Sequence, residues 1–230
     1  LEGLDHDIIF RTPGLMPFDE HLVKAAERGS VITSEMEVFF SVCPCRIFSI
    51  TGSDGKTTTS SIIAELLREA GYNVHLGGNI GHPLLCESPE IKKEDVVVLE
   101  LSSFQLHSMK CKSDVALITN ISPNHLDKHK DYQDYIDSKM AIFQLQDEND
   151  RLVLNLDDEQ SDYFRKNARA KISYFSHRSS VERGCILEDR RIYRIDEAGR
   201  HFIMDADEIK LPGEHNIHNY LAAFAAVEGY

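Results

Sequence analysis

The stretch from residue 47 to residue 59, which reads IFSITGSDGKTTT, constrains the fold of this chain more than any other. Its first four residues are mostly apolar and predict a strand, and a loop with two glycines follows. Lys56 and Thr57 come directly after the second glycine, and an amphipathic helical pattern then continues to a stop at Gly71. A strand, a glycine loop, a Lys-Thr pair and a helix in this order are typical of a phosphate-binding loop.

The chemistry of such a loop depends on its backbone and on two side chains. Glycines allow successive N–H groups to turn toward a phosphate, and the N-terminus of the helix adds partial positive charge. Lys56 is then placed to reach the β- and γ-phosphates, and Thr57 to bind Mg²⁺ through its hydroxyl. The match is incomplete, because Ile50 stands where the common pattern has its first glycine. The alternative is a glycine turn between a strand and a helix that binds nothing.

Composition excludes several classes of function. The 230 residues are 42% apolar and 27% charged, which is typical of a globular protein with a sizeable core. Lys and Arg number 25 against 38 Asp and Glu, a net charge of −13 that argues against binding a nucleic acid polymer but not a nucleotide. We find no signal peptide and no apolar run of membrane-spanning length, and the five scattered cysteines indicate reduced thiols. We therefore expect a cytoplasmic protein that does not contact a membrane.

The order of elements predicts an α/β fold with a mostly parallel sheet flanked by helices. After the phosphate loop, apolar runs predict strands at residues 73–76, 96–99, 115–119, 152–156 and 171–175. Helical patterns lie between some of these runs, notably at residues 132–145, and an alanine-rich helix is expected at 217–228. Three short strands within residues 185–204 predict a small antiparallel addition. Residues 1–45 read as the end of a preceding α/β domain, and residues 46–230 as a second domain.

Two candidate site residues follow strand ends. Glu100 comes directly after the apolar run at 96–99, where a carboxylate that directs Mg²⁺ belongs in a phosphate-loop protein, although it could instead cap a helix. His125 lies in a loop shortly after the strand at 115–119. Ligands of open α/β sheets bind outside the carboxyl ends of the strands, so this position favours a role in the site over an ordinary loop histidine.

Lys139 is the third candidate. The predicted helix at 132–145 carries an apolar stripe of Tyr132, Ile136 and Phe143, and Lys139 completes that stripe. A lysine buried there would need a partner or a chemical change, whereas a lysine on the flank could extend its ammonium group to solvent. The spacing does not decide between these alternatives.

Taken together, the motifs resemble those of the Mur ligases, the ATP-dependent amino-acid-adding enzymes of peptidoglycan synthesis. The resemblance covers essentially the whole chain and follows the family order, with the helix bearing Lys139 in its expected place. The matching segments are TGSDGKTT (51–58), GNIG (78–81), LELSSFQL (99–106), NHLD (124–127) and GEHNIHN (213–219). Within the family, the second and third of these segments are most similar to those of the D-glutamate-adding members.

The resemblance implies a role for each matching residue. Lys56, Glu100, His125 and Lys139 would be the catalytic residues. The ATP phosphates would be held by Lys56 and the surrounding loop residues Gly52, Ser53, Asp54, Gly55, Thr57 and Thr58. Thr57 and Glu100 would serve the Mg²⁺ between the β- and γ-phosphates, and His125 would serve a second Mg²⁺. A carbamylated Lys139 would offer oxygen to metal, and Asn216 and Asn219 would face adenine. The UDP-sugar substrate would lie near Asn79, Ser102, Gln105, Thr12 and Gly14.

One residue departs from the family pattern. Many relatives have Asn where this chain has Asp54. A carboxylate beside the phosphates should weaken nucleotide binding slightly unless a metal ion offsets its charge.

The implied reaction has two steps. The carboxylate of UDP-N-acetylmuramoyl-L-alanine attacks the γ-phosphate of ATP to form an acyl phosphate, and the amine of D-glutamate then displaces phosphate. Family members also have an N-terminal domain that binds UDP and a C-terminal domain that binds the incoming amino acid. We expect this chain to contain only the end of the former and none of the latter, to be a monomer, and to be inactive by itself.

Three alternatives remain at this point. The chain could belong to a Mur ligase that adds a different amino acid, or it could be a nucleotide-binding module without ligase activity. A small-molecule kinase is a third, but that class would not account for Asn79, Lys139 and the Asn216–Asn219 pair. The presence of Lys56, Glu100, His125 and Lys139 together argues against a degenerate module.

Overall fold

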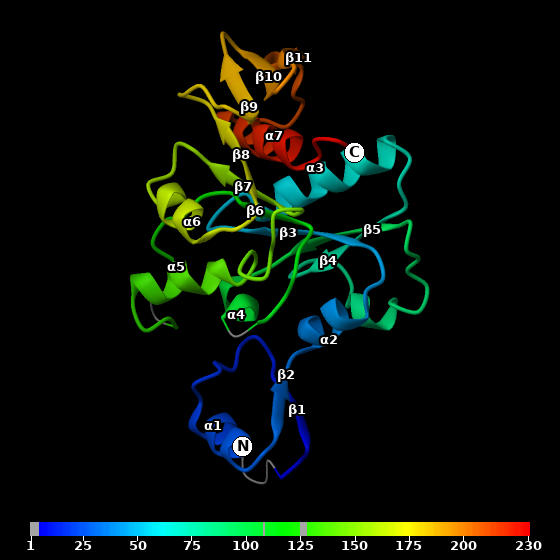
Figure 1. Cartoon of the computed structure of the whole chain (residues 1–230), viewed down its shortest axis with the longest axis vertical. Helices are drawn as coiled ribbons and strands as arrows, with labels where there is room; N and C mark the ends of the chain where they lie inside the picture. The colour runs from blue at the N-terminus through cyan, green and yellow to red at the C-terminus, as the bar shows by residue number, and fades with distance from the viewer. Residues whose placement is uncertain (1–4, 108, 125–127) are drawn as a thin grey trace.

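The computed structural model describes residues 5–107, 109–124 and 128–230, and a nine-stranded sheet forms its centre (Figure 1). The strand order is β11-β10-β9-β8-β7-β6-β3-β5-β4. The seven strands from β4 to β9 in this order are parallel, and β9, β10 and β11 form an antiparallel meander at one edge. The strands are β3 (Arg46–Thr51), β4 (Val74–Gly78), β5 (Val96–Glu100), β6 (Val115–Ile118), β7 (Arg151–Asn155), β8 (Lys171–Ser176), β9 (Gly184–Glu188), β10 (Arg191–Asp196) and β11 (Gly199–Asp205). The prediction of a mostly parallel sheet with an antiparallel addition is confirmed.

Helices cover both faces of this sheet. They are α2 (Glu35–Val42), α3 (Lys56–Glu69), α4 (Ser103–Leu106), α5 (Tyr132–Met140), α6 (Ser161–Asn167) and α7 (Glu214–Ala226), with 3₁₀ turns η1 (Leu84–Cys86) and η2 (Ala206–Glu208). Helices α3 and α7 pack together on one face, and α2, α4 and α5 lie on the other (Figure 1). No helix in the described part of the chain has both the length and the apolar character needed to cross a bilayer.

The continuous apolar runs of the central strands arise because both faces of the sheet are buried. In β5, Val96 and Val98 face the core under α3 and α7, whereas Val97 and Leu99 face the core under α2, α4 and α5. Successive side chains of a strand point to opposite faces, so a strand between two helical layers must be apolar at every position.

The first elements form a small separate unit. Strands β1 (Ile8–Phe10) and β2 (Val31–Thr33) pair in parallel, and α1 (Glu20–Glu27) covers them through a core of Ile9, Leu22 and Ala25. The Arg11 guanidinium joins this unit to the segment after β5, because it donates to the Leu15 carbonyl (2.8 Å) and to the Phe104 carbonyl (3.3 Å).

Helix α5 is shorter than the sequence pattern predicts. It ends at Met140 and not at residue 145. The Phe143 N–H donates to the Met140 carbonyl (3.0 Å), a tighter turn than an α-helix makes. This turn directs Ile142 and Phe143 into the core. Burial of these side chains therefore decides where the helix stops.

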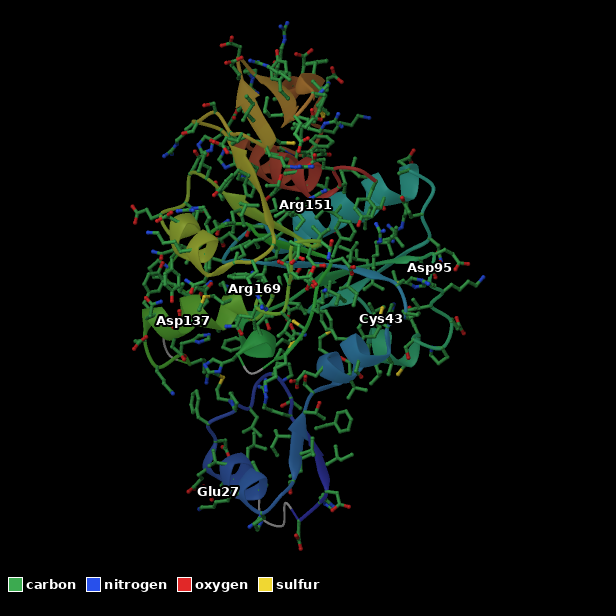
Figure 2. All side chains as sticks on the ribbon, viewed as in Figure 1. Glu27, Cys43, Asp95, Asp137, Arg151 and Arg169 are labelled. Carbon is green, nitrogen blue, oxygen red and sulfur yellow. The ribbon has the colours of Figure 1, made fainter. Side chains whose placement is uncertain are left out.

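The end of α7 is fixed by an arginine from the sheet. The Arg151 guanidinium, labelled in Figure 2, donates to the carbonyls of Ala226 (3.2 Å) and Glu228 (2.8 Å). A cation at the C-terminus of a helix satisfies free carbonyls and interacts favourably with the helix dipole. Helix α7 packs on α3, the helix that follows the phosphate loop. The Arg151 contact therefore also helps to fix the position of α3.

Candidate active site

The predicted phosphate loop connects β3 to α3 as the sequence pattern requires. The strand ends at Thr51, and α3 begins at Lys56 with Gly55 as its N-cap. Gly55 has φ +78°, and a Cβ there would lie 2.4 Å from Oδ1 of Asn219. Only glycine fits that conformation and that space. The loop backbone therefore turns in front of the helix N-terminus, where an anion binds.

Residues at the end of β6 hold the loop in place. The Thr119 hydroxyl and the Asn120 amide both donate to the Asp54 carbonyl, at 2.6 and 3.0 Å. Oδ1 of Asn120 accepts from the Asp54 N–H (3.0 Å), and its carbonyl accepts from the Ser53 N–H (2.9 Å). Sequence analysis missed this role, although the position of these two residues at the end of a predicted strand was a usable signal. Asp54 itself is exposed to solvent.

Two lysines converge on one carbonyl oxygen. The Lys56 ammonium donates to the Gly52 carbonyl (3.0 Å) and to the Ser53 carbonyl (2.8 Å). The Lys139 ammonium, from the far end of α5, donates to the same Gly52 carbonyl (3.1 Å). Two lysine amino groups thus lie against a neutral carbonyl, and an anion beside them would stabilise their charged forms.

Lys139 is buried, which decides between the two alternatives left open by the sequence. Its exposed fraction is 1%, and its ammonium lies 4.5 Å from the centre of the Tyr135 ring. Burial, and secondarily the charge of Lys56, lowers the pKa of the Lys139 ammonium to about 7. The Tyr135 hydroxyl lies 2.7 Å from Oγ of Ser53, so this ring connects α5 to the phosphate loop.

Glu100 contacts two of the other predicted site residues. Its Oε2 accepts from the Thr57 hydroxyl (2.6 Å), and its Oε1 accepts from the Asn79 amide (2.9 Å). The carboxylate belongs to a residue that is 2% exposed. It does not cap the following helix, because Ser102 is the N-cap of α4. Glu100 is therefore free to direct its charge toward the loop.

Gly78, the last residue of β4, allows this strand to lie close to the Glu100 carbonyl, and we predict that its replacement lowers stability. Gly78 has φ +96°, and a Cβ there would lie 2.2 Å from the Glu100 carbonyl. We expect Gly78→Ala to lower the free energy of unfolding by about 2–3 kcal/mol, from a strained backbone and a displaced strand end. Gly71→Ala is the matched control, since Gly71 has φ +93° with nothing within 4 Å. Urea unfolding should show a clearly smaller loss for Gly71→Ala, and equal losses would contradict the role of the close contact.

The predicted substrate residues divide between two cavities. One of about 260 Å³ is lined by Gly52, Ser53, Lys56, Asn79, Ser102, Ser103, Phe104, Asn124, Tyr135 and Lys139. A second, of about 190 Å³, is lined by Thr12 and Gln105 among others. Gly14 is exposed and lines neither of these cavities. Predicted residues from five segments thus border these two cavities, with Ser102 lining one and Gln105 the other.

Ser102 and Gln105 already have structural partners. The Gln105 N–H donates to Oγ of Ser102 (3.3 Å), and Oε1 of Gln105 accepts from the Ser102 N–H (2.9 Å). This reciprocal pair is a capping box at the start of α4.

His125, the predicted ligand of a second Mg²⁺, lies outside the described residues.

The two predicted adenine-facing residues also contact each other. Nδ2 of Asn219 donates to Oδ1 of Asn216 (3.0 Å), and Nδ2 of Asn216 donates to the Pro212 carbonyl (2.7 Å). Oδ1 of Asn219 accepts from the Thr59 hydroxyl in the first turn of α3 (3.3 Å). The pair therefore lies beside the phosphate loop, near the partly buried Thr58.

The parallel sheet and the glycine loop before α3 define a phosphate-loop α/β domain. A family model described as the Mur ligase middle domain matches residues 50–227. The chain therefore belongs to the Mur ligase family.

Individual relatives agree with this assignment. The chain is 50% identical over 224 residues to a UDP-N-acetylmuramoylalanine–D-glutamate ligase of Ruminiclostridium cellulolyticum, covering 97% of this chain and 48% of the relative. It is 49% identical to the protein of the same name from Acetivibrio thermocellus, covering 96% and 47%. The chain thus spans about half the length of these curated relatives.

Solved structures share the fold. A UDP-N-acetylmuramate:L-alanyl-gamma-D-glutamyl-meso-diaminopimelate ligase from Neisseria meningitides superimposes with a TM-score of 0.65 at 17% identity, covering 96% of this chain and 73% of that one. MurF from Acinetobacter baumannii gives a TM-score of 0.62 at 17% identity, covering 95% and 55%. At these identities the likeness shows the fold alone.

Proposed function

We propose that this chain is the ATP-binding part of a cytoplasmic, monomeric ligase that joins D-glutamate to UDP-N-acetylmuramoyl-L-alanine. The two relatives that are 50% and 49% identical are both named UDP-N-acetylmuramoylalanine–D-glutamate ligase, and this name supports the choice of substrates. The observation that carries the proposal is the convergence of Lys56 and Lys139 on the Gly52 carbonyl. A structural glycine turn has no need of two lysines, one of them buried, whereas a site that binds phosphates through Lys56 and carbamylates the buried amine of Lys139 does.

Lys56 acts on the phosphates of ATP. Its ammonium donates to loop carbonyls, which are weaker partners than an anion. When ATP binds, the ammonium moves onto the β- and γ-phosphates, and the N–H groups at the start of α3 donate to the same oxygens. During transfer, negative charge shifts among the phosphate oxygens, and Lys56 stabilises that charge.

Lys139 becomes a carbamate in the working enzyme. The neutral form of the buried amine adds to the carbon of CO₂, a nitrogen–carbon bond forms, and the amine loses one proton to solvent. The side chain then carries one negative charge and can pair with the nearby Lys56 ammonium. This change converts a repulsive contact at the Gly52 carbonyl into an attractive one and removes the cost of burying an ammonium group.

The described residues also fit Mg²⁺. Oγ of Thr57 and Oε2 of Glu100 lie 2.6 Å apart at the N-terminus of α3, and hard cations prefer such oxygen donors. Thr57 and Glu100 would hold one Mg²⁺, His125 would serve a second, and the Lys139 carbamate would offer oxygen to metal. Bound Mg²⁺ would neutralise charge on the phosphates.

The remaining residues hold the reactants in line. Asn216 and Asn219 bind adenine, and Asn79 and Ser102 border the cavity that contains both lysines. Thr12, Gly14 and Gln105 lie toward the UDP side of the substrate. The substrate carboxylate attacks the γ-phosphorus, the acyl phosphate forms as ADP leaves, and the D-glutamate amine then displaces phosphate. Positioning supplies much of the rate, since each step joins two bound reactants.

An assay of the full-length protein tests the proposed substrates. With ATP, Mg²⁺ and UDP-N-acetylmuramoyl-L-alanine, we expect phosphate release and a UDP-linked dipeptide product with D-glutamate, at a rate at least about 10³ times that with L-lysine or meso-diaminopimelate. The product is identified by mass spectrometry. Turnover with another amino acid in place of D-glutamate would identify a different ligase of the family. ATP binding without turnover on any of them would favour a non-catalytic module.

A further inference from the structure

Beside the proposed active site, two histidines and an aspartate form a cluster that the ligase chemistry above does not use. Nε2 of His107 lies 3.0 Å from Oδ2 of Asp134, and Nδ1 of His129 lies 3.1 Å from the same oxygen. The three side chains come from different segments. His107 follows α4, His129 precedes α5, and Asp134 lies in the first turn of α5.

The cluster is sheltered from solvent. The His129 side chain is fully buried, and those of His107 and Asp134 are 12% and 19% exposed. The His129 ring stacks on both His107 and Phe104 and contacts the edge of Tyr135. The potential ligand atoms of the three side chains all lie within 4.8 Å of one another. They would need only a small contraction to surround one ion.

The side chains of the cluster are of the types that bind a metal. Burial lowers the pKa of His129 despite its contact with Asp134, which favours the neutral ring that metals require. Burial raises the pKa of the Asp134 carboxyl, but hydrogen bonds from His107, the Lys130 N–H and His129 outweigh it, so the pKa lies below its ordinary value. The cluster therefore offers two imidazole rings and one carboxylate as ligands.

Metal binding would change which ring nitrogen of each histidine carries the proton. The surroundings of the two nitrogens that do not face Asp134 are compatible with this change. Without a metal, Nδ1–H of His129 donates to Asp134, and Nε2 can accept from the Ser103 hydroxyl at 3.0 Å. With a metal on Nδ1, the proton moves to Nε2, and the same hydroxyl becomes the acceptor. Nδ1 of His107 is buried and has no hydrogen-bond partner among the described atoms, so it can carry the ring proton without breaking a contact.

We propose that His107, His129 and Asp134 form a three-ligand site for a divalent cation of the zinc type, separate from the proposed Mg²⁺ site. Two imidazoles and a carboxylate suit Zn²⁺ or Co²⁺ better than Mg²⁺, which prefers oxygen alone. Ligand atoms around a tetrahedral zinc are about 3.3 Å apart, given bond lengths of about 2 Å, close to the 3.0 and 3.1 Å seen here. Water would complete the coordination.

Metal binding at this site would tie together two segments that carry proposed site residues. The segment before His107 contains the capping pair Ser102 and Gln105, and α5 carries Lys139. Tyr135 contacts both the His129 ring and the Lys139 ammonium. A bound ion would thereby fix the position of α5 against the end of β5.

Cobalt spectroscopy tests the proposal without any measurement of turnover. The full-length protein, untagged and with Cys43→Ser and Cys45→Ser, is saturated with Mg²⁺ and titrated with Co²⁺. The two thiols are removed because their sulfurs lie only 3.7 Å apart and could themselves bind the metal (Cys43 is labelled in Figure 2). We expect one equivalent of Co²⁺ to give the visible absorption of a four- or five-coordinate site, and Zn²⁺ to abolish it by displacement.

Three variants distinguish the cluster from other histidines. His107→Ala and Asp134→Asn should each weaken Co²⁺ binding at least about tenfold, because each removes one of three ligands. His75→Ala is the matched control, since His75 also pairs with an aspartate, Asp95 at 2.9 Å, and should leave binding unchanged. Circular dichroism checks the fold, and His107→Gln replaces any variant that fails. Absence of the absorption, or equal affinity in the cluster variants and the control, would overturn the proposal.

Discussion

Replacing Lys56 with alanine should abolish acyl-phosphate formation by the full-length protein while leaving the fold intact. We expect a fall of at least about 10³-fold, because the variant loses a cation placed at the phosphate oxygens while charge develops there. The fold should survive, since Lys56 is only partly buried and its carbonyl partners, Gly52 and Ser53, lie in a loop that Thr119 and Asn120 also hold. The measurement is ATP-dependent acyl-phosphate formation, trapped chemically, at saturating ATP.

A surface lysine provides the control for this experiment. Among the described residues, Lys24 on α1 pairs only with Glu20, in solvent, so Lys24→Ala should keep full activity. Turnover of Lys56→Ala at the wild-type rate under saturating ATP would show that Lys56 does not act on the phosphates.

Lys139→Ala should reduce activity by about 10²–10³-fold, and short carboxylates added to the buffer should partly restore it. The physical reason is the space that forms when the lysine side chain is removed. The 1% exposed Lys139 ends beside the Gly52 carbonyl and the Tyr135 ring, where alanine creates a space next to Lys56. Acetate or formate can enter that space and return an anionic oxygen to it. Activity is measured as phosphate release at increasing carboxylate concentration.

Two control experiments test whether the rescue is specific to position 139 and to carboxylates. Lys166→Ala, on the exposed surface of α6, should show neither loss nor rescue. Lys139→Ala with ammonium or alkylamine salts in place of carboxylates should gain nothing, because a cation does not replace a carbamate. Normal activity of Lys139→Ala would mean that the buried lysine has only a structural role, and rescue by amines would mean that its charge is positive in the working enzyme.

The fold could be predicted largely because its signals are local. The apolar run at Val96–Leu99 indicates a strand buried on both faces, and the glycine loop before Lys56 indicates the strand-to-helix turn, each within a few neighbouring residues. The end of α5 could not be predicted in this way. Its position depends on Phe143 turning into the core, a contact with distant segments that overrides the local helical pattern.

The site was predictable where residues follow strand ends, and not where the fold joins distant segments. The position of Glu100 beside the phosphate loop could be predicted because the carboxyl ends of parallel strands meet at one edge. The burial of Lys139 was undecided, because it depends on the Gly52 carbonyl, 87 residues away in the sequence. The histidine cluster was missed for the same reason. His107 and Asp134 are 27 residues apart, and their spacing matches no metal-binding motif.

A crystal structure of the full-length protein with Mg²⁺ and a non-hydrolysable ATP analogue tests the central claim most directly, namely that Lys56 binds the phosphates of ATP while Lys139 carries a carbamate. We predict that the β- and γ-phosphates lie on the loop at residues 52–57 and that Nζ of Lys56 has moved from the Gly52 carbonyl onto them. We also predict that Nζ of Lys139 carries the additional density of a carbamate. A nucleotide bound elsewhere, with both lysines still on the Gly52 carbonyl, would contradict the account.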